Sequence, residues 1–61
     1  KRPDRIILRN GRVIIVDFKF GNEVPGHRKQ LGAYRELLKE MGYQKVEAYL
    51  WYVDQSKVVE L

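Results

Sequence analysis

The chain contains no cysteine, one histidine and one methionine among its 61 residues. Without cysteine there is no disulfide and no thiolate metal site, and the single His27 cannot form a histidine-rich zinc cluster. No apolar run approaches the ~20 residues that a membrane-spanning helix needs, so we expect no membrane association. A chain of this length makes one small domain, which buries only about 60% of the surface that its unfolded form exposes.

Basic residues outnumber acidic residues, twelve to eight, and the formal net charge is +4. Many of the basic residues lie near the start of the chain: Lys1, Arg2, Arg5, Arg9, Arg12 and Lys19. This distribution suits a polyanionic partner. A solvated sheet edge that is protected by charge explains the same distribution equally well. The hydrophobic content of 44% is ordinary for a globular protein.

Residues 5–9 and 12–19 are rich in β-branched side chains and are joined by Asn10-Gly11. This dipeptide between apolar segments is the strongest short-range signal for a hairpin with a type I′ turn. Such a turn places Leu8 opposite Val13, and it gives the hairpin two largely apolar faces. Strands that are apolar on both faces are usually covered on both sides.

The same register brings two acids together. It places Asp4 opposite Asp17, with Lys19 one pleat further along the same face. Opposed side chains have Cβ atoms about 5 Å apart, where two carboxylates repel by about 3 kcal/mol at an effective dielectric constant of about 20. A divalent metal ion would relieve this repulsion. Alternatively, both acids are solvated strand-end residues, and Lys19 forms an exposed ion pair of little energetic value.

The rest of the chain predicts one helix and two strands. Apolar residues recur at helical spacing from His27 to Met41, and Gly42 supplies the stop. Gly32 inside this helix suggests a close approach to a strand. The β-rich residues 46–53 and the short segment 58–61 follow as strands. We therefore predict an α/β fold of order β-β-α-β-β, a mixed sheet with one covering helix, in which the long crossover makes two strands parallel.

One helix covers only one face of the predicted sheet, and the chain begins without a methionine or a cap before its first strand. We therefore expect residues 1–61 to be a fragment of a larger domain. The remaining core would come from the parent protein or from a second copy of the chain, so we expect a homodimer for the isolated fragment.

Gln30 and Tyr34 lie one turn apart on the predicted helix, so both can face the sheet near the two acids. In a strand–helix–strand unit, binding sites form outside the carboxyl ends of the strands, where this helix begins. A purely structural explanation also exists, in which Gln30 is a partly exposed helix residue and Tyr34 is ordinary core packing.

In chain order, Pro3-Asp4, Asp17-Phe18-Lys19 and the helical Gln30-Leu-Gly-Ala-Tyr34 resemble the core of the PD-(D/E)xK nucleases. More narrowly, the pattern is similar to the nuclease domain at the C-terminus of RecB/AddA-type helicase–nucleases, and it runs over nearly the whole chain. The resemblance implies a truncated restriction-endonuclease-like core without the family's first helix. The upstream histidine of many RecB-like members is also absent. No phosphate-binding loop of the form G-x-x-x-x-G-K-[ST] is present, so any ATP binding would belong to the parent protein.

The resemblance implies metal-dependent hydrolysis of DNA phosphodiesters by five catalytic residues: Asp4, Asp17, Lys19, Gln30 and Tyr34. The two acids and the backbone carbonyl of Phe18 would hold Mg²⁺ or Mn²⁺, which activates water and stabilises charge on the phosphate. Lysine is a cation at neutral pH, which favours an orienting, electrostatic role for Lys19. Gln30 would orient the lysine or the DNA backbone, with Tyr34 behind it.

Contacts with DNA would come from Arg2, Arg5, Lys19, Arg28 and Lys29. The partners would be DNA and the rest of a parent helicase–nuclease that acts in repair and recombination in the bacterial cytoplasm, near the nucleoid. Two other classes of function stay open. One is a non-catalytic nucleic-acid-binding module that uses Arg2, Arg5, Arg9 and Arg12 on phosphate. The other is a dimerisation module with Tyr49 and Trp51 at its interface.

Overall fold

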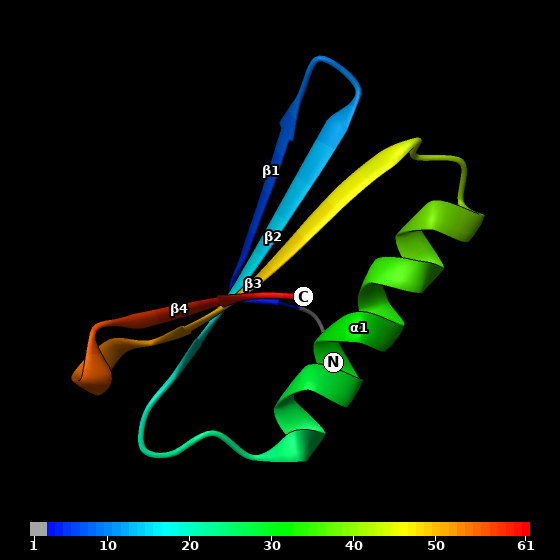
Figure 1. The fold of residues 1–61 in the computed structure, drawn as a ribbon. Helices are drawn as coiled ribbons and strands as arrows, with labels where there is room; N and C mark the ends of the chain where they lie inside the picture. The colour runs from blue at the N-terminus through cyan, green and yellow to red at the C-terminus, as the bar shows by residue number, and fades with distance from the viewer. Residues whose placement is uncertain (1–2) are drawn as a thin grey trace.

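The computed structural model describes residues 3–61 and shows one helix packed on a four-stranded mixed sheet (Figure 1). In chain order the elements are β1 (Arg5–Arg9), β2 (Arg12–Lys19), α1 (Pro25–Glu40), β3 (Lys45–Tyr52), the short 3₁₀ helix η1 (Val53–Gln55) and β4 (Lys57–Glu60). The strands lie in the order β1-β2-β3-β4, with β2 and β3 parallel and the other two pairs antiparallel. The predicted order, parallel crossover and mixed sheet are confirmed.

The hairpin between β1 and β2 has the predicted turn and register. Asn10 and Gly11 have φ angles of 53° and 78°, and a type I′ turn requires positive φ at both central residues. Arg9 therefore faces Arg12, and the register continues as predicted through five pairs to the start of β1. Because side chains alternate along a strand, this register decides which residues of β1 and β2 share a face of the sheet.

Helix α1 starts two residues earlier than predicted and ends one residue earlier. Pro25 stands at its first turn, where the missing N–H costs no helical hydrogen bond. At the other end, Gly42 has φ 107° and its N–H donates to the Lys39 carbonyl at 3.0 Å. The Tyr43 N–H donates to the Leu38 carbonyl at 3.3 Å. These two bonds are the Schellman pattern, so the predicted glycine stop is confirmed.

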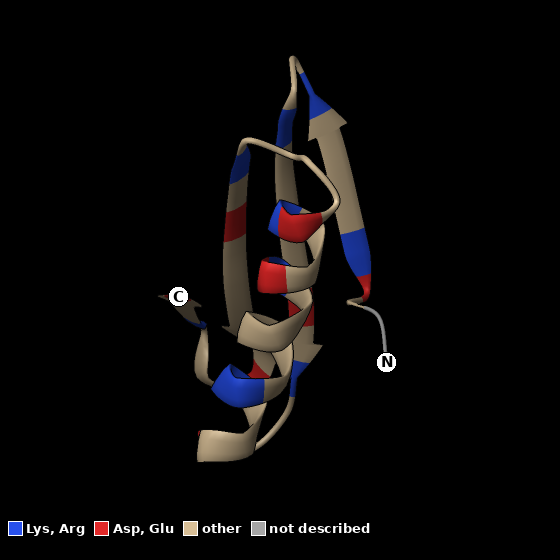
Figure 2. Cartoon of the chain, turned by 90° about the vertical axis from the view of Figure 1, so that its right-hand side faces the viewer, with Lys and Arg blue, Asp and Glu red and all other residues tan. Residues whose placement is uncertain are grey.

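The core lies between α1 and one face of the sheet. Its buried residues are Val13, Ile15, Leu31, Leu38, Val46, Ala48, Leu50 and Tyr52. The helix packs mainly on β3 and leaves β1 uncovered at the sheet edge (Figure 2). Ile6 and Leu8, which share the helix-side face, therefore remain 48% and 62% exposed. Within residues 3–61 no helix is both long and apolar enough to cross a membrane.

The other face of the sheet has no covering element among the described residues. Ile7, Trp51 and Val58 are exposed there, and the rings of Phe18 and Trp51 meet at a centroid distance of 5.5 Å. The face assignments made from the alternation of side chains are thus confirmed. Apolar surface is thus exposed on both faces of the sheet. The further covering element and the homodimer stay predictions.

Gly32 does not mark a close approach between the helix and a strand, so that expectation is wrong. A Cβ atom at this position would have Leu61 Cδ2, at 3.8 Å, as its nearest neighbour, which is an ordinary van der Waals contact. The backbone at Gly32 is helical, and it lies in the middle of α1. The glycine therefore lowers helix stability without a steric reason.

We expect Gly32→Ala to raise the free energy of unfolding by about 1 kcal/mol, because alanine has the higher helix propensity and restricts the unfolded chain. Urea unfolding followed by circular dichroism measures the change. Gly42→Ala is the matched control and should destabilise the fold, since φ is 107° there. A Gly32→Ala chain that is less stable than the wild type would contradict the conclusion that a Cβ at position 32 fits beside Leu61 without a clash.

Candidate functional site

The last residues of β2 carry two charged side chains to the helix side of the sheet. Asp17 and Lys19 alternate in step with the buried Val13 and Ile15, so they share the face that α1 covers. Asp17 is only 8% exposed, and its neighbour in β3 is the fully buried Leu50. A carboxylate in such surroundings needs a charged or hydrogen-bonding partner.

Lys19 is that partner. Its Nζ lies 2.9 Å from Asp17 Oδ2, and the two side chains are 16% and 11% exposed. The pair is therefore largely shielded from water, unlike the exposed pair considered from the sequence. Charge interactions are stronger in such a setting than at the surface, and the loss of one partner leaves the other charge poorly solvated. The arrangement keeps an ammonium and a carboxylate in fixed contact.

Asp4 reaches the same stretch of β2 from the start of β1. The ladder between β1 and β2 ends one pair short of Asp4 and Asp17, so Asp4 lies in a bend rather than opposite its partner within the strand. Its Oδ2 accepts a hydrogen bond of 2.9 Å from the Phe18 backbone N–H. The side chain thus binds an amide of β2 beyond the end of the ladder. Asp4 thus lies beside the short segment of β2 that carries Asp17 and Lys19.

The donor chemistry at this point suits a hard divalent cation. Two carboxylates, from Asp4 and Asp17, and the carbonyl of Phe18 are all oxygen ligands. Magnesium is usually held by one or two carboxylates and completes its shell with water and substrate phosphate. Among residues 3–61 there is no cluster of three or more acidic, histidine or cysteine side chains that could hold a metal ion. These donors fit an open magnesium-type site and not a closed protein cage.

Tyr52 and His27 adjoin the site and were not singled out from the sequence as site residues. Tyr52 pairs with Lys19 across the parallel strands and is 1% exposed. Its hydroxyl lies 3.0 Å from His27 Nδ1, which joins the first turns of α1 to the sheet. The position of Tyr52 beside Lys19 follows from the parallel register of β2 and β3, which no local signal gives.

Gln30 and Tyr34 lie on the flank of α1 that turns toward β2 and β1. Leu61, which follows β4, contacts the helix at Gly32. Gln30 is two residues from Gly32, about 200° around the helix axis, so it lies on the flank of α1 that is turned away from Leu61. Tyr34 packs against the core, whereas Gln30 is exposed. They line a shallow pocket of about 260 Å³ together with Ala33 and Leu37. The structure thus groups the two residues on the flank nearer the acids.

The residues predicted to contact DNA do not form one surface. Lys19 lies in the site, whereas Arg5 alternates onto the outer face of the sheet, away from the acids. Arg28 and Lys29 are exposed on α1. Arg2 lies outside the described residues. Arg5 and Lys19 thus lie on opposite faces of the sheet, and the contacts with DNA stay predictions.

The loop that follows the site is tied to the connection between β3 and β4. The Gly21 N–H donates to both carboxylate oxygens of Asp54 at 3.0 Å, and Gln55 Nε2 donates to the Gly21 carbonyl at 2.7 Å. Lys57 Nζ binds the carboxylate of Glu23. The hydrogen bond from Lys57 is the main cause that lowers the pKa of Glu23 below its usual range. These contacts anchor the chain between the site and the start of α1.

Comparison with known families agrees with this geometry. A sequence model of the PD-(D/E)XK nuclease superfamily matches residues 2–60. The chain belongs to the PD-(D/E)XK nuclease superfamily. Searches of curated proteins and of solved structures returned no match. Membership implies nuclease activity, and nucleases of this superfamily generally use divalent metal ions, which fits the oxygen donors of Asp4, Asp17 and Phe18.

We expect the Glu23–Lys57 contact to make the stability of this PD-(D/E)XK nuclease depend on pH. The folded pKa of Glu23 is lowered, so the contact stabilises the fold above the ordinary glutamate pKa. The contribution is lost as the pH falls through the lowered folded value. Urea unfolding of the wild type and of Glu23→Gln over this range measures it. The free energies of unfolding of the two chains should differ at neutral pH and become equal in acid. A difference that did not change with pH would show that the Glu23–Lys57 contact is not its source.

Proposed function

We propose that this PD-(D/E)XK nuclease hydrolyses DNA phosphodiester bonds with Mg²⁺ or Mn²⁺, and that Asp4, Asp17 and Lys19 form its reactive centre. The observation that carries the proposal is the shielded ion pair of Asp17 and Lys19, with the Asp4 carboxylate bound to the amide between them. Stability alone does not require this pair, because an apolar pair of similar size in a shielded place is often at least as stabilising.

The metal ion would be held by Asp4, Asp17 and the carbonyl of Phe18. When bound, it supplies positive charge beside the phosphate and lowers the pKa of water. The remaining steps belong to the chain's own residues. Asp17 holds the Lys19 ammonium at 2.9 Å before any substrate arrives, so the charge needs little rearrangement. Lys19 then orients the attacking water and the phosphoryl oxygens.

Gln30 and Tyr34 would serve the same centre from the flank of α1. Gln30 is exposed and its amide can both donate and accept, so we propose that it orients Lys19 or the DNA backbone. Tyr34 packs on the core and would support Gln30 from behind. Phosphate contacts outside the centre would come from Arg28 and Lys29, which are exposed on α1.

The likeness to RecB/AddA-type proteins supports a finer proposal. The order Asp17-Phe18-Lys19 and then Gln30-Leu-Gly-Ala-Tyr34 resembles that of the nuclease domain of such helicase–nucleases. We propose that the chain is the catalytic core of a protein of this type, which acts on DNA during repair and recombination in the bacterial cytoplasm. ATP binding and helicase activity would belong to other parts of that protein.

We expect Mn²⁺ to stabilise the wild-type chain through Asp17. A metal ion at about 100 times its Kd adds about 2.7 kcal/mol to the free energy of unfolding, which raises the Tm of a domain this small by roughly 10–20 °C. Thermal unfolding during a Mn²⁺ titration measures the shift. Asp17→Asn should abolish it, whereas Glu40→Gln, which removes an exposed carboxylate of α1, should keep it. Equal shifts in both variants would show that Mn²⁺ binds elsewhere.

We expect Lys19→Ala to lower the rate of metal-dependent DNA cleavage by about 10²-fold, a typical effect of removing one preorganised electrostatic contact. The decrease should fall on kcat more than on KM, because Lys19 acts on the reacting phosphate. Cleavage of a labelled single-stranded oligonucleotide in Mg²⁺ measures both constants. Lys39→Ala, an exposed lysine of α1, is the control and should cleave normally. If a folded Lys19→Ala chain had the kcat of the wild type, Lys19 would have no role in the reaction.

A further inference from the structure

A second group of basic side chains lies at the hairpin end of the sheet, on the outer face. Arg9 faces Arg12 across the hairpin, and Arg12 faces Lys45 across the parallel pair. The three residues thus form one row across β1, β2 and β3. Figure 2 shows this concentration of Lys and Arg at the hairpin end of the three strands. Neighbouring strands are about 4.8 Å apart, so the row places like charges close together.

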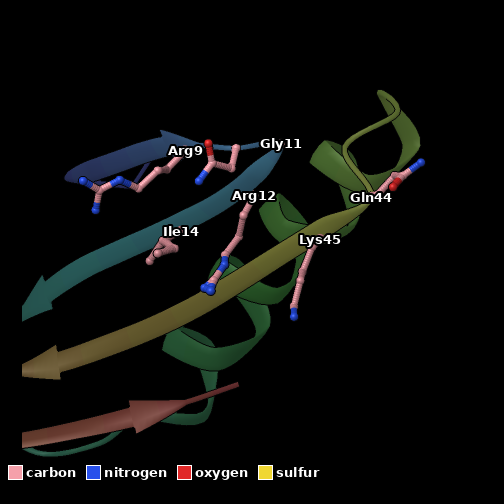
Figure 3. Close-up of a pocket in the computed structure, with 7 residues that line it drawn as sticks. Arg9, Gly11, Arg12, Ile14, Gln44 and Lys45 are labelled. Atoms are coloured by element: carbon pink, nitrogen blue, oxygen red, sulfur yellow. The ribbon is translucent and has the colours of Figure 1, made fainter.

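The row borders a pocket of about 540 Å³. Its lining consists of Arg9, Asn10, Gly11, Arg12, Ile14, Gln44 and Lys45 (Figure 3). Apart from Ile14, the side chains of this lining are cationic or amides, and none is acidic. In Figure 3 the long side chains of Arg9, Arg12 and Lys45 fan out over the outer face, with Ile14 between the two arginines.

Only part of this positive charge is neutralised within the fold. Arg12 Nε lies 3.1 Å from Glu47 Oε2, and the Tyr49 hydroxyl donates to the other oxygen of Glu47 at 2.7 Å. Each oxygen of the Glu47 carboxylate thus has one of these two partners. Within residues 3–61, neither Arg9 nor Lys45 forms an ion pair. Arg9 and Lys45, at the two ends of the row, are therefore two cations without an ion-pair partner, and the lining of the pocket that they share contains no acid.

We propose that this pocket binds a backbone phosphate of the nucleic acid strand, at a subsite separate from the reactive centre. A tetrahedral phosphate accepts several hydrogen bonds at once, which suits a guanidinium, an ammonium and the amides of Asn10 and Gln44. Arg12 and Lys19 are seven residues apart on β2, so the subsite lies about 23 Å along the strand from the centre, on the other side of the sheet. It would bind a phosphate several nucleotides away from the scissile one.

The choice of a nucleic acid as the source of this phosphate rests on the proposed function. Inorganic phosphate offers the same chemistry, so the experiment must separate the two sources. Binding is therefore measured in EDTA, where no cleavage occurs. If the chain does not hydrolyse DNA in Mg²⁺, the binding measured in EDTA still tests the subsite. If the subsite does not bind phosphate, the cleavage measured in Mg²⁺ still tests the proposed function.

The test is the binding of a fluorescently labelled single-stranded oligonucleotide to the chain, followed by anisotropy over a range of salt concentrations. Arg9→Gln and Lys45→Gln are made separately and together, and both leave the Arg12–Glu47 pair in place. Lys39→Gln is the control, since it removes the same charge from the exposed surface of α1. Circular dichroism and Tm confirm that each variant is folded.

We expect the double variant to bind about three- to tenfold more weakly, with a salt slope smaller by about one, as for the loss of one phosphate contact. Lys39→Gln should match the wild type. Equal affinity and slope in the double variant and in Lys39→Gln would overturn the proposal. It would also be overturned if inorganic phosphate shifted the amide resonances of Arg9 and Lys45 while the double variant bound the oligonucleotide normally.

Discussion

The register of the first hairpin is the constraint on which the rest of the structure depends. Asn10 and Gly11 accept the positive φ angles of a type I′ turn, and this turn permits only one alignment of β1 with β2. A slip of one residue would turn every side chain of β2 to the other face. This alignment places Arg9 beside Arg12 and brings Asp4 to the stretch of β2 that carries Asp17 and Lys19.

A chain of 61 residues has little core with which to offset the cost of a buried charge. Asp17 nevertheless lies among core residues, at 8% exposure, and is stabilised by Lys19 at 2.9 Å. Next to this pair, the Asp4 side chain accepts a hydrogen bond from the Phe18 amide at the point where the β1–β2 ladder ends. The proposed site and the scaffold therefore share the same residues.

The two faces of the sheet have different chemistry, and this bears on the way a nucleic acid would lie. The helix-side face combines the core with Asp17 and Lys19 at one end. The outer face carries the basic row at the other end and exposed apolar residues such as Trp51. A nucleic acid strand that reached both the proposed centre and the basic row would have to pass from one face of the sheet to the other. The edge at β1 is not covered by the helix (Figure 2). The remaining apolar surface suits contacts with protein.

The sequence alone determined the hairpin, its register, the order of the elements and the residues of β2 that share a face, because turn chemistry and alternation are local properties. It also indicated Asp4, Asp17 and Lys19 as one group. Only the tertiary structure decided that the acid–lysine pair is shielded and that Asp4 binds a backbone amide outside the ladder. The contact of Tyr52 with His27 depends on the packing of α1 against β3, and the position of Lys45 beside Arg12 depends on the parallel register of β2 and β3. Long-range packing sets both.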